Sequence, residues 1–181
     1  MRRFLDRLYL ASGALAALFI VAICVVVLLQ VGANLIDVAA KLITGEPVGI
    51  VIPSYAEFAG FFLAAASFLA LAHTLRRGDH IRVSLLITHV RGTPRRVMEL
   101  VCIGVALAVS AYFAWFMFDL VLESFEYGDL STGMVPVKLW VPQLSLALGL
   151  VVLAIALADE FVCVLRGGDP SYEKNSQAPA E

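Results

Sequence analysis

The sequence predicts an all-α integral membrane protein with four transmembrane helices and a short interfacial helix between the second and the third. Two observations lead to this fold class. Hydrophobic residues make up 61% of the 181 residues and charged residues only 15%, with a mean hydropathy of +0.90, a composition that soluble domains do not show. In addition, four runs of about 20 residues or more contain no Asp, Glu, Lys or Arg, and a helix of that length crosses the roughly 30 Å apolar core of a bilayer.

The four apolar runs are continuous, whereas membrane β-strands alternate lipid-facing and lumen-facing residues in segments of about ten. We therefore expect each run to be one transmembrane helix: Leu8 to Ile36, Phe58 to Leu75, Leu100 to Phe118, and Leu139 to Ala158. The first run follows Arg2 and Arg3, as in a secretory signal, but the apolar part of a signal peptide is only about 7–15 residues long. This run is much longer and has no small-residue cleavage site at its end, so we expect it to remain as the first span.

The segment between the second and third runs is polar but still periodic. Ile81, Leu85 and His89 are spaced four residues apart. This spacing predicts a short helix in the membrane interface over residues 79–92.

Two boundaries follow from local composition. Thr93 and Pro94 match an N-cap and a first helical position, so the third helix is expected to start near Arg95. Residues 1–166 are expected to form a four-helix transmembrane domain. Residues 167–181 are polar and rich in Gly, Pro and Ser, which is typical of a disordered tail, here a cytoplasmic one.

Positive charge is unevenly distributed between the connecting segments. Arginines are abundant before the first run and between the second and third, whereas the Asn34 to Pro53 and Asp119 to Lys138 loops each contain a single lysine. Because loops rich in Lys and Arg stay on the cytoplasmic side, we expect a multi-pass membrane protein with both termini and the arginine loop cytoplasmic. Arg76 and Arg77 are then expected to contact lipid headgroups.

No combination of residues indicates catalysis or a bound metal. His73, His80 and His89 lack a companion carboxylate at ligand spacing, and the three cysteines form no C-x-x-C pair, so we interpret the cysteines as small hydrophobic residues. The arginine loop has no aromatic residue to stack on nucleic acid, and the formal net charge is −2. We therefore expect no enzyme, no cofactor and no nucleic-acid partner, with membrane lipids as partners of the arginines.

Ionisable residues at membrane depth would mark an ion or proton path. In this sequence the carboxylates near the runs stand at their ends, where we expect them to reach headgroup water: Glu57, Glu99, Asp159 and Glu160. A transporter that works alone needs polar groups near the midplane and usually broken helices in inverted repeats. The sequence has neither, which favours a supporting subunit.

Small residues spaced four apart could allow close packing of the spans, although alanine-rich helices also contain such pairs by chance. The pairs are Gly60 and Ala64, Gly104 and Ala108, and Ser145 and Gly149.

Two stretches carry a resemblance to a known family. "EFAGFFLAAASFLALAHTLRRGDHIRVSLL", Glu57 to Leu86, resembles the second span and following loop of the small membrane subunit of tripartite ATP-independent periplasmic (TRAP) transporters. "STGMVPVKLWVPQLSLALG", Ser131 to Gly149, is similar to the loop and fourth span of the same subunit. In that family an acidic residue opens the second span, a Gly-x-His-Ile/Val-x-Val stretch follows it, and Gly, Pro, Trp and Pro-Gln recur in this order.

The resemblance implies a small scaffold subunit in the bacterial inner membrane, part of a secondary transporter that imports small organic acids with a sodium gradient. Its partners are a large TRAP membrane subunit and a periplasmic solute-binding protein, and the small subunit holds no substrate, catalytic or metal site. The motif residues implied to shape the fold, the lipid interface and the subunit contacts are Glu57, Gly78, His80, Arg82, Gly133, Pro136, Trp140, Pro142 and Gln143. Arg76 and Arg77 join them as the residues expected from the charge distribution to lie at the lipid interface.

Two other classes remain open. An autonomous channel or carrier formed by several copies of the chain would need polar residues along a central path, which the apolar runs do not supply. A membrane redox protein would need His73 or the cysteines as ligands, and haem would be visible in an absorbance spectrum.

Overall fold

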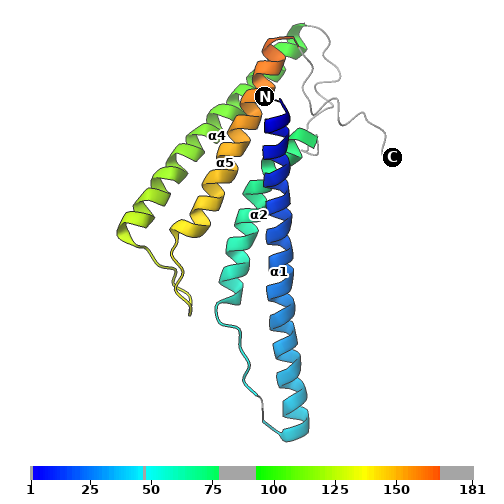
Figure 1. The fold of residues 1–181 in the computed structure, drawn as a ribbon, viewed down its shortest axis with the longest axis vertical. Coiled ribbons are helices and arrows are strands. Elements are labelled where there is room, and N and C mark those ends of the chain that lie inside the picture. Colours follow the sequence, from blue (N-terminus) through cyan, green and yellow to red (C-terminus); the bar gives the residue numbers. More distant parts are fainter. Residues whose placement is uncertain (1, 47, 78–92, 168–181) are drawn as a thin grey trace, which may run out of the picture.

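The computed structural model describes residues 2–46, 48–77 and 93–167 (Figure 1). The described residues form four helices: α1 (Arg2–Thr44), α2 (Tyr55–Arg77), α4 (Thr93–Tyr127) and α5 (Trp140–Leu165). All four are long and apolar enough to cross a membrane, and these residues contain no β-strand beyond one isolated bridge between Leu130 and Lys138. The predicted all-α fold with four transmembrane helices is therefore confirmed.

The helices stand in a row rather than in a closed bundle. In Figure 1 the order across the row is α4, α5, α2, α1. The main contacts join α4 to α5, α5 to α2, and α2 to α1, with a smaller contact between α1 and α5. The row therefore has α2 and α5 at its centre, and its outer helices each have most of their surface free of other helices.

The two central helices approach each other closely at Gly149. A Cβ atom added there would lie 2.6 Å from the carbonyl carbon of Phe68, so only glycine fits. Gly104 is looser, with a Cβ 3.4 Å from the Phe161 ring, and Gly60 has no neighbour within 4 Å. The predicted close packing is thus confirmed at Gly149, whereas Gly60 does not take part in it.

The structure extends α1 well beyond the predicted run of Leu8 to Ile36. The helix has 43 residues, or about 64 Å at 1.5 Å per residue. Its last four turns continue because they are amphipathic, with a polar stripe at intervals of three and four residues: Gln30, Asn34, Asp37, Lys41 and Thr44. The helix ends at Thr44 and is followed by Gly45, whose φ of +82° is the left-handed conformation typical of the residue after a helix.

The polar stripe holds the segment that returns from α1 to α2. The Asp37 carboxylate accepts hydrogen bonds from the backbone N–H groups of Gly49 (2.9 Å) and Ile50 (3.4 Å). Two turns earlier on α1, the Gln30 side-chain oxygen accepts a hydrogen bond from the N–H of Ile52 at 3.3 Å. The return segment therefore lies against the polar face of α1.

Other predictions concern the boundaries. The third span was expected near Arg95, and α4 begins at Thr93, so the Thr93-Pro94 start is confirmed within the usual uncertainty of helix ends. The predicted interfacial helix over residues 79–92 and almost all of the predicted tail over 167–181 lie outside the described residues. They stay predictions.

Candidate functional site

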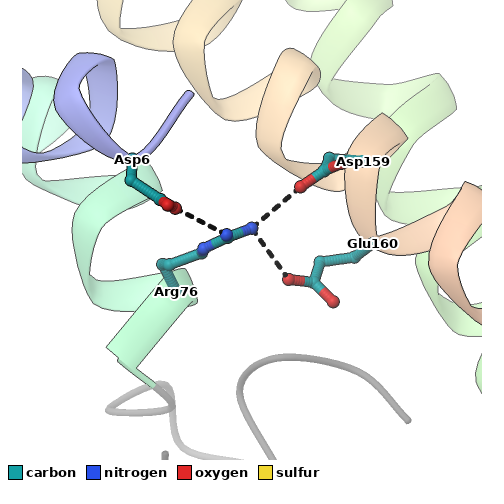
Figure 2. A network of polar contacts seen from close by, with 4 residues as sticks. All are labelled: Asp6, Arg76, Asp159 and Glu160. Atoms are coloured by element: carbon teal, nitrogen blue, oxygen red, sulfur yellow. Dashed lines mark hydrogen bonds and ion pairs between the residues drawn. The ribbon is translucent and has the colours of Figure 1, made fainter. Parts of the chain in front are cut away.

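Arg76 is the centre of a polar network that joins three helices (Figure 2). It stands in the last turn of α2. Its Nη2 lies 2.7 Å from Oδ1 of Asp6 on α1, and its Nη1 lies 2.8 Å from Oδ2 of Asp159 on α5. The same Nη1 is 3.6 Å from Oε1 of Glu160. One guanidinium thus connects α2 to both of its neighbours in the row.

The network runs from solvent into the interior of the protein. The Asp6 side chain is 54% exposed, that of Asp159 30%, and that of Glu160 only 2%. The ring of the fully buried Tyr9 lies beneath the guanidinium, with 5.3 Å between Cζ of Arg76 and the ring centroid, a cation–π distance. Such partly desolvated pairs are directional, because a planar guanidinium bonds carboxylates at fixed angles.

Next to the network, α1 and α2 approach each other closely. The Ser12 hydroxyl donates a hydrogen bond to the Leu69 carbonyl oxygen. A Cβ added at Gly13 would lie 2.7 Å from the ring of His73, so the imidazole rests on the glycine. His73 is therefore a packing residue between two helices. Among the described residues, no group of three or more His, Cys, Asp or Glu side chains is placed to hold a metal ion.

The acidic residues at this end differ from expectation. Glu99 and Glu160 were expected to reach headgroup water, but both are buried, at 7% and 2% relative exposure. That expectation is wrong, because a position at the end of an apolar run does not specify which side of the helix a residue occupies. Glu99 instead pairs with Arg95 at 3.4 Å, one turn earlier on α4.

Arg76 and Arg77 were expected to behave alike, as anchors for lipid headgroups. The structure gives them different surroundings. Arg76 is engaged with carboxylates of the chain itself, whereas Arg77 is exposed. Headgroup contact stays a prediction for both.

A second site lies at the opposite end of the helices from Arg76, where the loop between α4 and α5 meets the start of α2. The Glu57 carboxylate lies directly against Gly133, in the place that a Cβ would occupy. The Ser54 hydroxyl oxygen accepts a hydrogen bond from the N–H of Val135 at 2.9 Å. Glu57 and Gly133, which were singled out separately in the sequence, are thus in contact.

Ser54 and Glu57 have the Ser-x-x-Glu spacing of a capping box, in which the two side chains normally bond each other's backbone. Here Ser54 has a φ of +56°, and its hydroxyl bonds the distant loop instead. The Glu57 Oε2 is buried and has no hydrogen-bond partner among the described residues. The start of α2 therefore serves a tertiary contact rather than a local cap.

The remaining predicted residues divide into three groups. Trp140 stacks edge-to-face on Phe125, with 5.6 Å between ring centroids, and so closes the turn between α4 and α5. Pro142 borders a small apolar cavity next to Phe58, Gln143 has a buried side-chain oxygen with no partner among the described residues, and Pro136 is exposed in the loop. Three lie outside the described residues: Gly78, His80 and Arg82.

Sequence reasoning missed Asp6, Tyr9, Ser12 and Ser54. Asp6 offered one signal, since it is an acidic residue two positions before the first apolar run, on the same expected side of the membrane as Arg76. The three others are ordinary in type and position. The cysteines were interpreted as small hydrophobic residues, and Cys24 and Cys102 lie on exposed helix surfaces rather than in the core of the chain.

Replacing Arg76 is expected to destabilise the row. Arg76→Gln removes the guanidinium that Asp6, Asp159 and Glu160 share. The free energy of unfolding should fall by roughly 1–3 kcal/mol, less than for a fully buried pair because two of the carboxylates are partly solvated. Reversible unfolding in detergent micelles measures the change. Arg77→Gln is the matched control and should leave stability unchanged; equal losses in both variants would contradict a specific role for Arg76.

Gly133 and Glu57 are expected to be energetically coupled. Gly133→Ala places a methyl group where the Glu57 carboxylate lies and should lower the free energy of unfolding by about 1–3 kcal/mol. In a Glu57→Ala background the space is vacant, so the same substitution should cost much less. A double-mutant cycle with this pair should give a coupling of about 1 kcal/mol or more, and strictly additive effects would refute the contact.

Comparison with known proteins identifies the family of the chain. Residues 48–167 match the family model described as "Tripartite ATP-independent periplasmic transporters, DctQ component". No curated protein and no solved structure shows a significant match. The family match covers well over half of the chain, including α2, α4, α5, the Glu57–Gly133 contact and the Arg76–Asp159 pair. The chain therefore belongs to the DctQ family, the small component of the TRAP transporters.

Proposed function

We propose that the chain is the scaffold subunit of a secondary transporter that imports small organic acids. In this proposal a periplasmic solute-binding protein delivers the solute and a large membrane subunit carries it, driven by a sodium gradient. The small subunit binds no solute. It provides a fixed surface in the membrane beside the large subunit, as the family match to one component of a tripartite system supports.

The distribution of charge is the observation that carries the proposal. Each of the four apolar runs is free of charged residues, and the ionised side chains gather at the helix ends. A solute anion or a coupling ion crossing the membrane needs polar groups near the midplane. A chain whose helices are apolar at the midplane and bonded to one another near their ends is suited to a structural role, while a partner supplies the transport path.

The two polar sites at opposite ends of the helices support a rigid arrangement of the chain. At one end Arg76 links α1, α2 and α5, and at the other Glu57 and Ser54 link the start of α2 to the loop before α5. Between these sites, Gly149 brings the backbones of α2 and α5 together. Because α2 is held near its start, at its middle and near its end, we expect the helices to keep their arrangement while a neighbouring subunit moves during transport.

Lys and Arg asymmetry supports an orientation with the Arg76 end cytoplasmic and the Trp140 end periplasmic. Single cysteines placed at Thr132 and Arg77, both exposed, test it in a background without the three native cysteines. A membrane-impermeant maleimide should label the Thr132→Cys variant in intact spheroplasts and the Arg77→Cys variant only after permeabilisation. The reverse pattern would invert the proposed topology.

Reconstitution tests the function itself. Liposomes should contain this chain, the large membrane subunit and the solute-binding protein, with each component omitted in turn. We expect sodium-dependent uptake of a radiolabelled dicarboxylate, keto acid or sugar acid only when all three are present, because the apolar runs of this chain supply no path of their own.

Two outcomes of the reconstitution would overturn the scaffold proposal. Uptake by this chain without the large subunit would indicate an autonomous carrier. Full uptake by the other two components alone would show that no scaffold is needed.

A further inference from the structure

One side of α1 carries a continuous row of exposed apolar residues. The row follows a heptad pattern, with alternating steps of three and four residues, and is called the α1 row below. Its members are Ala14, Ala17, Val21, Cys24, Leu28, Val31, Leu35, Val38 and Leu42. All nine are exposed in the chain. A heptad row of this kind is the geometry along which a second helix packs lengthwise.

The opposite side of α1 is already in use. Its buried residues follow the same spacing and include Tyr9, Ser12, Ala16 and Ala33. Ser12 bonds the Leu69 carbonyl, which places this side against α2. The α1 row therefore faces away from the neighbouring helix.

The C-terminal part of α1, called its outer part below, reaches past the thickness of a bilayer. Arg76 bonds both Asp6 of α1 and Asp159 of α5, so these residues lie at the same depth. This depth marks one end of the apolar segments of the helices. On α2 and α5, about twenty residues separate this level from Glu57 and Trp140, which matches an apolar core of about 30 Å. From Asp6 to Thr44, α1 runs roughly 57 Å at 1.5 Å per residue. Figure 1 shows the C-terminal part of α1 extending far beyond the first residues of α2 and α5.

In this outer part the two sides of α1 differ sharply. The polar side bonds the return segment at two positions, where the N–H groups of Gly49 and Ile52 donate to Asp37 and Gln30. On the apolar side Leu35 is 65% exposed and Leu42 is 85% exposed. Apolar surface left in water costs about 25 cal/mol per Å². The outer half of the α1 row is therefore a surface that a partner would cover with a gain in free energy.

The continuity of the row favours one partner that covers both halves over two separate ones. Lipid chains reach only the inner half, and a soluble protein reaches only the outer half. The described segments of this chain that contact α1 lie on its other side. One occupant that covers both halves is a helix that crosses the membrane and projects from it.

We propose that the α1 row is the docking surface for a transmembrane helix of the large subunit, packed along α1 from Ala14 to Leu42. This inference rests on the proposed function, which supplies the large membrane subunit as partner. The small side chains of Ala14 and Ala17 let the two helices approach closely at the inner end. The leucines and valines of the outer half then cover the projecting part.

Site-specific photo-cross-linking tests the proposal in the complete system. A benzoylphenylalanine is placed at Leu35 or Leu42, with the chain co-expressed with the large subunit and the solute-binding protein. Asn34 and Lys41 are the matched controls, since each is also exposed, lies at the same depth and belongs to the polar stripe. Irradiated membranes are then analysed for cross-linked large subunit.

We expect at least tenfold more cross-linked large subunit from positions 35 and 42 than from positions 34 and 41. A Leu35→Asn, Leu42→Asn double variant should also reduce the large subunit that copurifies with the tagged chain at least fivefold, with its membrane abundance unchanged. Equal cross-linking on both sides of α1, or products with a second copy, the binding protein or the chain itself, would overturn the docking surface. If the large subunit fails to copurify with the unmodified chain, the proposed function falls, and this inference falls with it.

Discussion

The arrangement of the helices depends on one charged residue at the edge of the apolar region. Arg76 lies in the last turn of α2, the helix that stands between α1 and α5, and its guanidinium bonds a carboxylate on each of those neighbours. In a bilayer, lipid chains are as apolar as the helix surfaces, so the hydrophobic effect does little to choose one pairing of helices over another. Partly buried charged groups do favour one pairing of helices over another, because an ionised side chain removed from water requires a partner of opposite charge. The order α1, α2, α5 follows from where these partners stand.

The rest of the row follows from steric fit. Gly149 lets the backbones of α2 and α5 meet, and Gly133 leaves room for the Glu57 carboxylate at the opposite end from Arg76. Both contacts require the absence of a side chain, and both join α2 to α5 or to the loop before it. The helix α2 is thus held at its start, its middle and its end. The result is a row in which each outer helix packs mainly against one neighbour, an arrangement that leaves more helix surface free for partners than a closed four-helix bundle.

This shape is consistent with a component of a larger assembly. The exposed side chains on α1 and α4 include many large apolar residues, as expected for surfaces that meet lipid or another membrane protein. The outer end of α1 differs, because it combines a polar side bonded to its own chain with an apolar side beyond the span of the other helices. Thus the same helix that is tied to Arg76 at one end presents an uncovered surface at the other.

The sequence by itself determined the number of spans, their approximate positions and the family, because runs of uncharged residues and short motifs such as the one from Ser131 to Gly149 are local properties of the chain. It also indicated Glu57 and Gly133 as residues of interest, but not their contact. Only the tertiary structure decided that Arg76 bonds Asp6 and Asp159, that Glu160 is buried, and that α1 continues past Ile36 with its polar stripe against the return segment. The physical reason is rotation about the helix axis: in a helix that is apolar on all sides, hydrophobic periodicity does not reveal which side faces a neighbour. Partners that lie 70 or 83 residues apart are then chosen by packing, which no local pattern records.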